Sequence, residues 1–131
     1  MNNPVAKFFA ALKDRDLDRA LSVVAEDVVF EAQGPNTVPI YGKFIGKKGV
    51  VEFLSILGEL FNTEAFEIYK LVAVDNYIFA HGYMQHRVKK TERIFKCEYA
   101  LVCTTKNGLI TSYKMFEDTA ALSEAYSSDR S

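Results

Sequence analysis

The chain has 131 residues, of which 49% are hydrophobic, 13% aromatic and 25% charged. This length fits one domain, and the apolar content excludes a disordered tail or a low-complexity linker. Sixteen basic and 17 acidic residues give a formal charge of −1, which argues against a nucleic-acid partner and against a basic membrane-binding surface.

The first half of the chain alternates helical segments with short strands. Apolar residues recur at intervals of three and four in three segments, which predicts three amphipathic helices. Capping residues, Asn3 before Pro4 and Asp16, mark the starts of the first two. In chain order we expect a helix over 4–12, a helix over 17–24, strands at 28–33 and 41–45 with a turn at 34–37, and a helix over 47–61.

In the second half the apolar period becomes two, which predicts strands. Asn107-Gly108 is a strong hairpin signal. We expect strands at 66–74, 77–88, 93–105 and 109–117, then a short helix within 118–131. Helices followed by a meander of antiparallel strands predict an α+β fold, with the helices on one face of a sheet.

The turns also predict which side chains share a face of the sheet. Directly opposed residues point to the same side, and we expect Tyr83 opposite Glu98, His81 opposite Ala100, and Glu98 opposite Glu117. One face is then mixed and the other mostly apolar. The mixed face carries Phe79, His81, Tyr83, Gln85, Glu98, Ala100, Val102, Tyr113, Met115 and Glu117, and the apolar face carries Ile78, Ala80, Gly82, Met84, Cys97, Tyr99, Leu101, Cys103 and Phe116.

We expect the mixed face to lie under the helices and line a cavity, and the uncovered apolar face to form a homodimer interface on the outside of the sheet. A β-bulge of one residue would change this assignment.

Location and cofactors are constrained by a few residue types. No segment approaches the roughly 18 consecutive apolar residues of a membrane span, and the charged N-terminus does not resemble a signal peptide. Cys97 and Cys103 would lie about 20 Å apart on one strand, too far for a disulfide. With two histidines as well, few metal ligands are available. We expect a cytoplasmic protein with no metal and no cofactor.

Three stretches, FFAALKDRDLDRALSVVAEDVVFE, YGKFIGKKGVVEFLSIL and NGLITSYKMFEDTAAL, resemble the SnoaL-like branch of the nuclear transport factor 2-like superfamily. The resemblance covers nearly the whole chain and implies one domain over 1–131, with ends that we expect to fray at 1–3 and about 127–131. It implies an α+β fold in which a strongly curved antiparallel or mixed sheet wraps around three helices. The result is a cone with an internal pocket, usually in a dimer.

The resemblance leaves the activity open, because members include ketosteroid isomerases, limonene epoxide hydrolases, polyketide cyclases and non-enzymatic binding domains. The positions of the isomerase base and its Tyr–Asp oxyanion pair hold three apolar residues, Ala32, Phe8 and Ala100. Tyr83 and Gln85 replace the Arg-x-Asp pair of the epoxide hydrolases. We expect neither of these two activities. Asp118 matches the acid/base residue of SnoaL-type cyclases.

Four residues are candidates for acid/base catalysis. Asp118 is first, although it also suits the N-cap of the last helix, and one carboxylate can serve both roles. His81 could transfer a proton near neutral pH or simply form a hydrogen bond within the sheet. Glu98 and Glu117, if opposed in a pocket, would raise the pKa of one carboxyl. A slip of one residue would instead place both in water.

We expect a SnoaL-like small-molecule-binding protein with an internal, largely apolar pocket for an apolar, oxygen-bearing ligand. It would be a cofactor-free acid/base isomerase or cyclase. The alternative is a non-enzymatic ligand-binding or dimerisation module. No residue pattern in the sequence points to a hydrolase with an unfamiliar arrangement of catalytic residues. The expected ligand contacts are Phe8, Phe30, Tyr41, Phe53, Tyr83, Gln85, Tyr113 and Met115.

Overall fold

The computed structural model describes residues 3–34 and 38–127. The elements follow one another as α1 (Pro4–Lys13), α2 (Leu17–Leu21), β1 (Val24–Ala32), β2 (Gly42–Ile45), α3 (Gly46–Leu60), β3 (Phe61–Val74), β4 (Tyr77–Val88), β5 (Ile94–Lys106), β6 (Leu109–Phe116) and α4 (Thr119–Ser127). Apart from Asn3 and Ser127, the ends at which we expect fraying lie outside the described residues, as does most of the 34–37 turn. Within the described ranges no helix is long and apolar enough to cross a membrane.

The first two helices start at the predicted capping residues. The side-chain oxygen of Asn3 accepts hydrogen bonds from the first two free backbone N–H groups of α1, at 2.9 and 3.2 Å. Asp16 caps α2 in the same way, at 3.1 Å. This second helix is shorter than predicted, because Val24 begins β1 and pairs with Ile110 in the sheet. The helical spacing of Val24 was therefore misleading, since it also fits a buried strand position.

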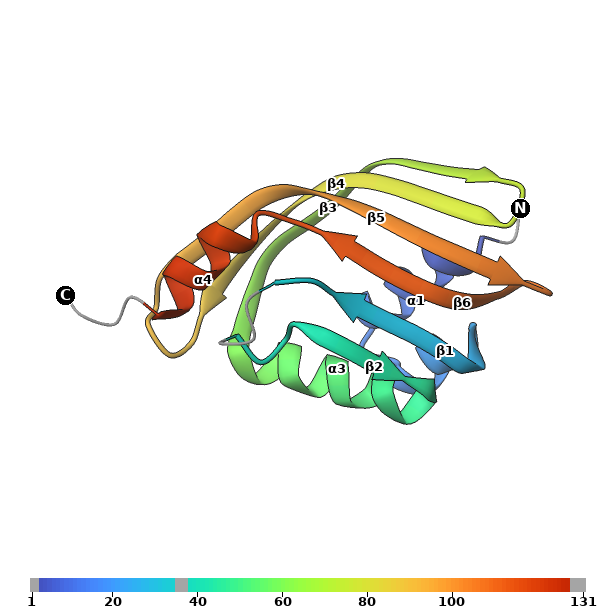
Figure 1. The fold of residues 1–131 in the computed structure, drawn as a ribbon, viewed down its shortest axis with the longest axis horizontal. Helices are drawn as coiled ribbons and strands as arrows, with labels where there is room; N and C mark the ends of the chain where they lie inside the picture. Colours follow the sequence, from blue (N-terminus) through green and yellow to red (C-terminus); the bar gives the residue numbers. More distant parts are fainter. Residues whose placement is uncertain (1–2, 35–37, 128–131) are drawn as a thin grey trace.

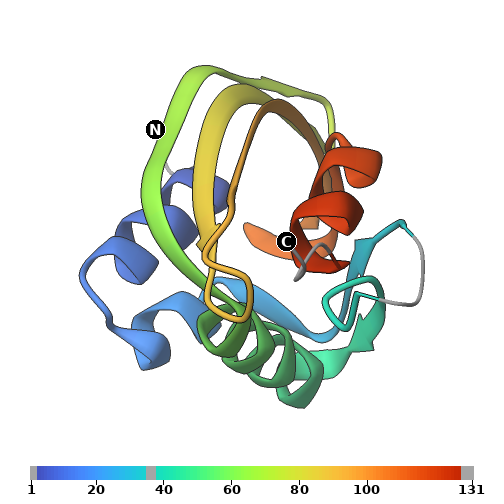
Figure 2. The ribbon, with the colours of Figure 1, turned by 90° about the vertical axis from the view of Figure 1, so that its left-hand side faces the viewer.

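Six strands form one sheet in the order β2-β1-β6-β5-β4-β3. Only the β1–β6 pair is parallel, so the last strand of the chain lies between the first strand and β5. The sheet is strongly curved (Figure 1) and curls around the helices without closing (Figure 2). Helix α4 lies at one end of the sheet (Figure 1). The predicted α+β fold with a curved mixed sheet is confirmed.

The predicted register between β4 and β5 is confirmed. Tyr83 lies opposite Glu98 and His81 lies opposite Ala100. The strands are long and the turn between them is short, so their register has little freedom to shift, and the position of the turn was enough to predict it.

The register between β5 and β6 differs from the prediction by one residue. Tyr113 lies opposite Cys103, whereas the predicted register, which sets Glu98 opposite Glu117, places it opposite Val102. The shift arises near the hairpin turn, where Thr111 is an extra residue in β6, which makes a β-bulge. A shift of one residue moves every later side chain to the other face, so Glu117 does not oppose Glu98. That predicted pairing is wrong.

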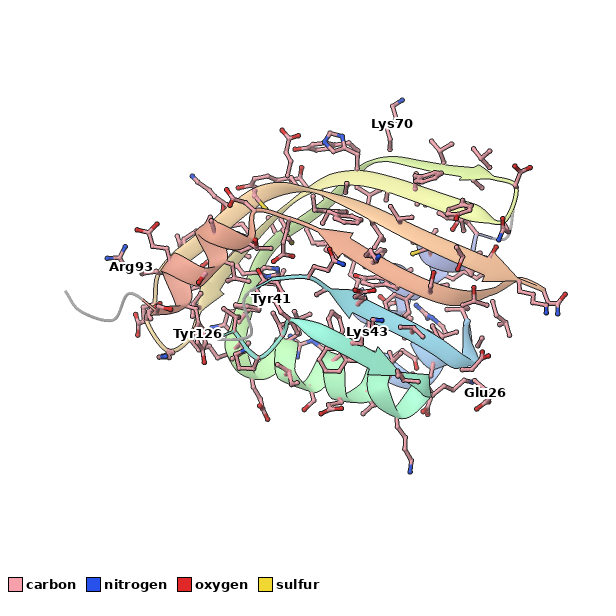
Figure 3. The ribbon with its side chains drawn as sticks, viewed as in Figure 1. Glu26, Tyr41, Lys43, Lys70, Arg93 and Tyr126 are labelled. Atoms are coloured by element: carbon pink, nitrogen blue, oxygen red, sulfur yellow. The ribbon has the colours of Figure 1, made fainter. Side chains whose placement is uncertain are left out.

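The helices cover the apolar face of β4 and β5 and leave the mixed face outside. The apolar residues Ile78, Ala80, Met84, Tyr99, Leu101 and Cys103 are all buried. Lys70 pairs with His81 across β3 and β4, and Lys70 projects away from the outer surface of the molecule (Figure 3). The predicted faces of these two strands are therefore reversed, because burying the more apolar face stabilises the fold more.

One glycine lets the strands pack closely at the centre of this buried face. The Tyr99 hydroxyl reaches across Gly82 and donates a hydrogen bond to the backbone oxygen of Glu67 at 3.0 Å. A Cβ atom at position 82 would lie 2.6 Å from that hydroxyl and would also meet the Glu67 oxygen. Only glycine leaves room for this contact between β3, β4 and β5.

Candidate functional site

The concave side of the sheet borders a cavity of about 1110 Å³. Side chains from α1, α3 and strands β3 to β6 form most of its wall, and most of them are apolar. Four of the predicted ligand contacts line this cavity: Phe8, Phe53, Tyr113 and Met115. Tyr113 and Met115 face inward because of the bulge in β6, which the sequence prediction did not contain.

An aromatic cluster supports this wall. The rings of Phe30 and Tyr113 stack almost in parallel, with their centroids 4.1 Å apart. Phe8 and Phe53 pack edge-on against Phe30, at 5.5 and 5.6 Å. Phe30 is buried behind Tyr113 and is not itself part of the lining. It therefore holds the orientation of the Tyr113 ring.

Two carboxyl groups line the cavity: Glu64, which is exposed, and Glu117, which is half-buried. Glu117 follows β6 directly and lines the cavity near the start of α4. The Tyr41 hydroxyl donates a hydrogen bond to its Oε2 at 2.9 Å. Burial raises the pKa of Glu117, the hydrogen bond from Tyr41 acts in the opposite direction, and the charge of Asp118 adds to the rise. A carboxyl with a raised pKa in an apolar cavity is suited to proton transfer near neutral pH.

Tyr41, predicted as a ligand contact, instead contacts the carboxyl group. It is buried in the segment before β2 and lies under the sheet (Figure 3). Its ring packs against Gly34, where a Cβ atom would come within 2.5 Å of the ring. Burial, followed by the charge of Glu117, raises the pKa of Tyr41 strongly. The hydroxyl therefore stays protonated and acts as a permanent donor to Glu117.

His86 is a second buried polar residue of the cavity, and it was not among the predicted site residues. It lies on β4, its Nδ1 is 2.9 Å from the Thr63 hydroxyl, and its ring stacks on Phe61 with centroids 5.0 Å apart. Burial lowers the pKa of His86 to about 4, so the imidazole is neutral at pH 7. Its position in the sequence was a usable signal, because it continues the inward alternation of Ile78, Ala80 and Met84.

Four predicted site residues lie on the outer face of the sheet. His81 Nε2 and Glu98 Oε1 are 2.8 Å apart, and both side chains are exposed. The Tyr83 hydroxyl donates a hydrogen bond to the Gln85 side-chain oxygen at 2.9 Å. The expectation that these four residues face the cavity is wrong, because it depended on the reversed assignment of the two faces of β4 and β5.

Asp118 is exposed and caps α4. Its Oδ1 accepts a hydrogen bond from the backbone N–H of Ala121 at 3.0 Å. The residue is not part of the cavity lining. Of the two roles that the sequence allows, the structure shows the N-cap.

The charged groups around the cavity limit what it can hold. Among residues 3–34 and 38–127, no three His, Cys, Asp or Glu side chains come close enough together to bind a metal ion. The cationic residues that contribute to the lining are Lys13, Arg15 and Lys89, and all three are exposed, which places them at the rim. An anionic group could therefore find a counter-charge at the rim of the cavity but not deep inside it.

Comparisons with known proteins agree with this architecture. Residues 5–113 match the model of the SnoaL-like domain, and a search of curated proteins finds no match. An NTF2-like protein from Burkholderia xenovorans LB400 is 28% identical with a TM-score of 0.87, over 94% of this chain and 92% of that one. A proposed isomerase from Bacillus subtilis is 21% identical with a TM-score of 0.72, over 94% and 89% of the chains. A proposed SnoaL-like polyketide cyclase from Mesorhizobium loti is 17% identical with a TM-score of 0.69, over 86% and 95%.

Proposed function

Because the chain belongs to the SnoaL-like family, we propose that it binds a small, largely apolar, oxygen-bearing ligand in its cavity and acts on it as a cofactor-free acid/base isomerase or cyclase. One observation carries the proposal. The Glu117 carboxyl lies in a mostly apolar cavity, burial raises its pKa, and the Tyr41 hydroxyl fixes one of its two oxygens.

In the proposed reaction Glu117 moves a proton between two atoms of the ligand. Its Oε2 is engaged by Tyr41, which leaves Oε1 for the ligand. The carboxylate takes a proton from an acidic C–H or O–H bond, and the resulting carboxyl returns the proton to another ligand atom. Between the two proton transfers the ligand carries a transient negative charge on oxygen, which a hydroxyl donor such as Tyr113 in the cavity wall stabilises.

The comparisons support this class of reaction without identifying a substrate. Two proteins with similar structures are described as a proposed isomerase and a proposed polyketide cyclase. Both are less than 25% identical to this chain, so their similarity concerns the fold, and their chemistry is a guide to the first substrates to test.

Exchange of hydrogen for deuterium tests the role of Glu117 before the natural substrate is known. Cyclic ketones such as 2-tetralone are incubated with the protein in D2O, and NMR follows deuterium entering next to the carbonyl. The Glu117→Gln variant keeps the shape of the side chain but cannot take the proton, so we expect the catalysed rate to fall about 100-fold or more. Glu98→Gln, on the outer face, is the matched control and should exchange at the wild-type rate. Equal rates in Glu117→Gln and wild type would refute the catalytic role.

The second candidate function is a non-enzymatic ligand-binding module of the same fold. The observation that favours it is that Glu117 lines the cavity alone among the four predicted acid/base residues. Ligand binding by both wild type and Glu117→Gln, with no catalysed exchange by either, would support this module over the enzyme.

A homodimer through the outer face of the sheet is also part of the proposal. Several large apolar side chains on β3, β4 and β6 are 42–50% exposed on that face: Tyr69, Val72, Tyr77, Phe79 and Phe116. The rings of Tyr77 and Phe79 stack on each other 5.6 Å apart. A second copy of the chain would cover this apolar surface.

The proposed location is the cytoplasm. Both cysteines are free, and Cys103 is buried in the sheet, which fits a reducing compartment. Fractionation of cells that express the chain tests this, and recovery in an oxidising compartment would contradict it.

A further inference from the structure

Besides the Tyr113 hydroxyl and several exposed polar residues, the cavity wall has a carboxyl and an imidazole that are not exposed, at two separated places. Glu117 lies at the end of β6, and His86 lies on β4 beside Thr63 of β3. We infer that the ligand is an uncharged, elongated molecule with a polar oxygen at each end, one of which contacts Glu117 and the other His86. This inference rests on the proposed function and specifies the class of ligand.

One ring nitrogen of His86 is free to meet a ligand. Thr63 engages Nδ1, whereas Nε2 has no hydrogen-bond partner among the described residues. Every fully shielded side-chain nitrogen or oxygen in the described part of the chain has a partner. Nε2 is therefore not fully shielded, and because His86 lines the cavity, we expect a ligand in the cavity to reach this nitrogen. A neutral imidazole whose other nitrogen faces a hydroxyl can present either a donor or an acceptor.

The two polar sites are too far apart for one small polar group. Continuing the β5–β6 register by one residue places Glu117 beside Tyr99, whereas His86 pairs with Phe95. The two sites are thus four residues apart along β5 and two strands apart across the sheet. At about 3.3 Å per residue and 4.8 Å per strand, they are roughly 16 Å apart along the surface. The curvature of the sheet brings the two side chains closer than that, so a ligand of two or three rings could span them.

The wall between the two sites is apolar. Met84 of β4 and Phe95 of β5, the strand between β4 and β6, both line the cavity in this part of the sheet. A ligand that spans the sites therefore has an apolar middle. Among the described lining residues the cations Lys13, Arg15 and Lys89 are exposed, so a negative end beside Glu117 would have no buried counter-charge.

Binding of phenols of graded length tests the inference on the wild-type protein. Isothermal titration compares hydroquinone, 4,4′-dihydroxybiphenyl and 4,4″-dihydroxy-p-terphenyl with the matching compounds that have one hydroxyl group. We expect one of the two longer diols to bind about fivefold more tightly than its mono-hydroxyl partner, because it gains one hydrogen bond. Hydroquinone is too short to reach both sites and should gain nothing. Equal affinities within all three pairs would overturn the inference.

Variants then assign the two ends. His86→Phe keeps a flat ring on Phe61 and should remove the advantage of the diol, while the mono-hydroxyl compound keeps its affinity through Glu117. His81→Phe, on the same strand but the outer face, is the matched control and should leave both affinities unchanged. An advantage of the diol that persists in His86→Phe would overturn the inference, and the wild-type comparison decides the matter if that variant does not fold.

Failure of the inference and failure of the proposed function give different results. If Glu117→Leu weakens binding of every phenol but the diols have no advantage, the proposed cavity function stands and the two-ended ligand is refuted. If no phenol binds the wild-type protein, both are refuted. Binding of 4′-hydroxybiphenyl-4-carboxylate as tightly as the diol would contradict an uncharged ligand.

Discussion

Burial shifts the pKa values of Glu117 and His86 in opposite directions, and both shifts favour the neutral form of the side chain. The pKa of the carboxyl is raised and that of the imidazole is lowered to about 4. The physical cause is shared, because an ion loses hydration when it enters a cavity of low polarity. Both groups can exchange protons or hydrogen bonds with a ligand, and each shift reduces the tendency of its group to carry an unpaired charge in the cavity.

The lowered pKa of His86 predicts a dependence of stability on pH. The unfolded chain binds a proton at His86 near pH 6.5, whereas the folded protein does so only near pH 4. The free energy of unfolding should therefore decrease as pH falls from about 6.5 to about 4, by about 3 kcal/mol for this one group. Urea denaturation at pH 7.5, 5.5 and 4.5 measures the effect. Wild type should lose stability relative to His86→Phe across this interval.

His81→Phe provides the control for that measurement. It removes an exposed histidine from the same strand, so its stability relative to wild type should change far less over the same interval. Parallel pH dependences of wild type and His86→Phe would contradict the buried, neutral imidazole.

Among single elements, β6 shows best what sequence could and could not predict. The strand and the Asn107-Gly108 turn were predictable, because local alternation and turn residues determine them. The bulge was not, because it depends on how Thr111 fits beside Thr104 in the neighbouring strand, where their hydroxyls are hydrogen-bonded at 2.7 Å. The sequence contains one sign of the bulge: Ile110 and Tyr113 are both buried although they are three positions apart, which regular alternation would place on opposite faces.

The bulge explains the inward position of Tyr113 and Met115, whereas the other site residues depend on how strongly each side chain favours burial and on which face of the sheet the helices cover. The apolar positions Phe8, Phe53, Tyr113 and Met115 were predictable, because a large aromatic or apolar side chain has few alternatives to burial. The polar positions His81 and Glu98 were not, because a polar residue gains as much from water as from a cavity. The register between β4 and β5 was predicted correctly, but it does not determine which face of these strands the helices cover, and the placement of His81 and Glu98 depends on that face.

Because Asp118 caps α4, we expect its replacement to change the stability of the protein and not its catalytic rate. Asp118→Ala removes the acceptor for the first turn and should lower the free energy of unfolding by about 1 kcal/mol. Asp118→Asn keeps a capping oxygen and should cost much less. Chemical denaturation measures both.

The same pair of variants tests whether Asp118 has a chemical role. As a cap alone, Asp118 should be dispensable for deuterium exchange into bound ketones, and both variants should keep the wild-type rate. A large loss of exchange in Asp118→Asn at unchanged stability would show that the carboxylate itself takes part in the reaction.

The whole molecule leaves its apolar outer face available to a second copy. Phe79→Glu places a charge among the exposed aromatic rings of β4, next to Tyr77, and should shift a dimer to a monomer by like-charge repulsion and loss of apolar contact. Light scattering at micromolar concentration measures the mass, with Ile45→Glu, on the distant edge strand β2, as the exposed control. A wild-type mass of about 15 kDa under these conditions would contradict the dimer.

The position of β6 between β1 and β5 also determines when the protein can fold during synthesis. β1 and β2 are made early, and the β3–β5 meander follows, but the two parts share a sheet only after β6 has been added. Pairing between strands so distant in sequence is slow, since a long loop must be closed before any contact is gained. The strand that joins the two parts of the sheet, β6, is therefore synthesised late, and Glu117 follows it directly in the chain. A chain that stops short of this strand has exposed strand edges, a risk of aggregation and no acid/base group.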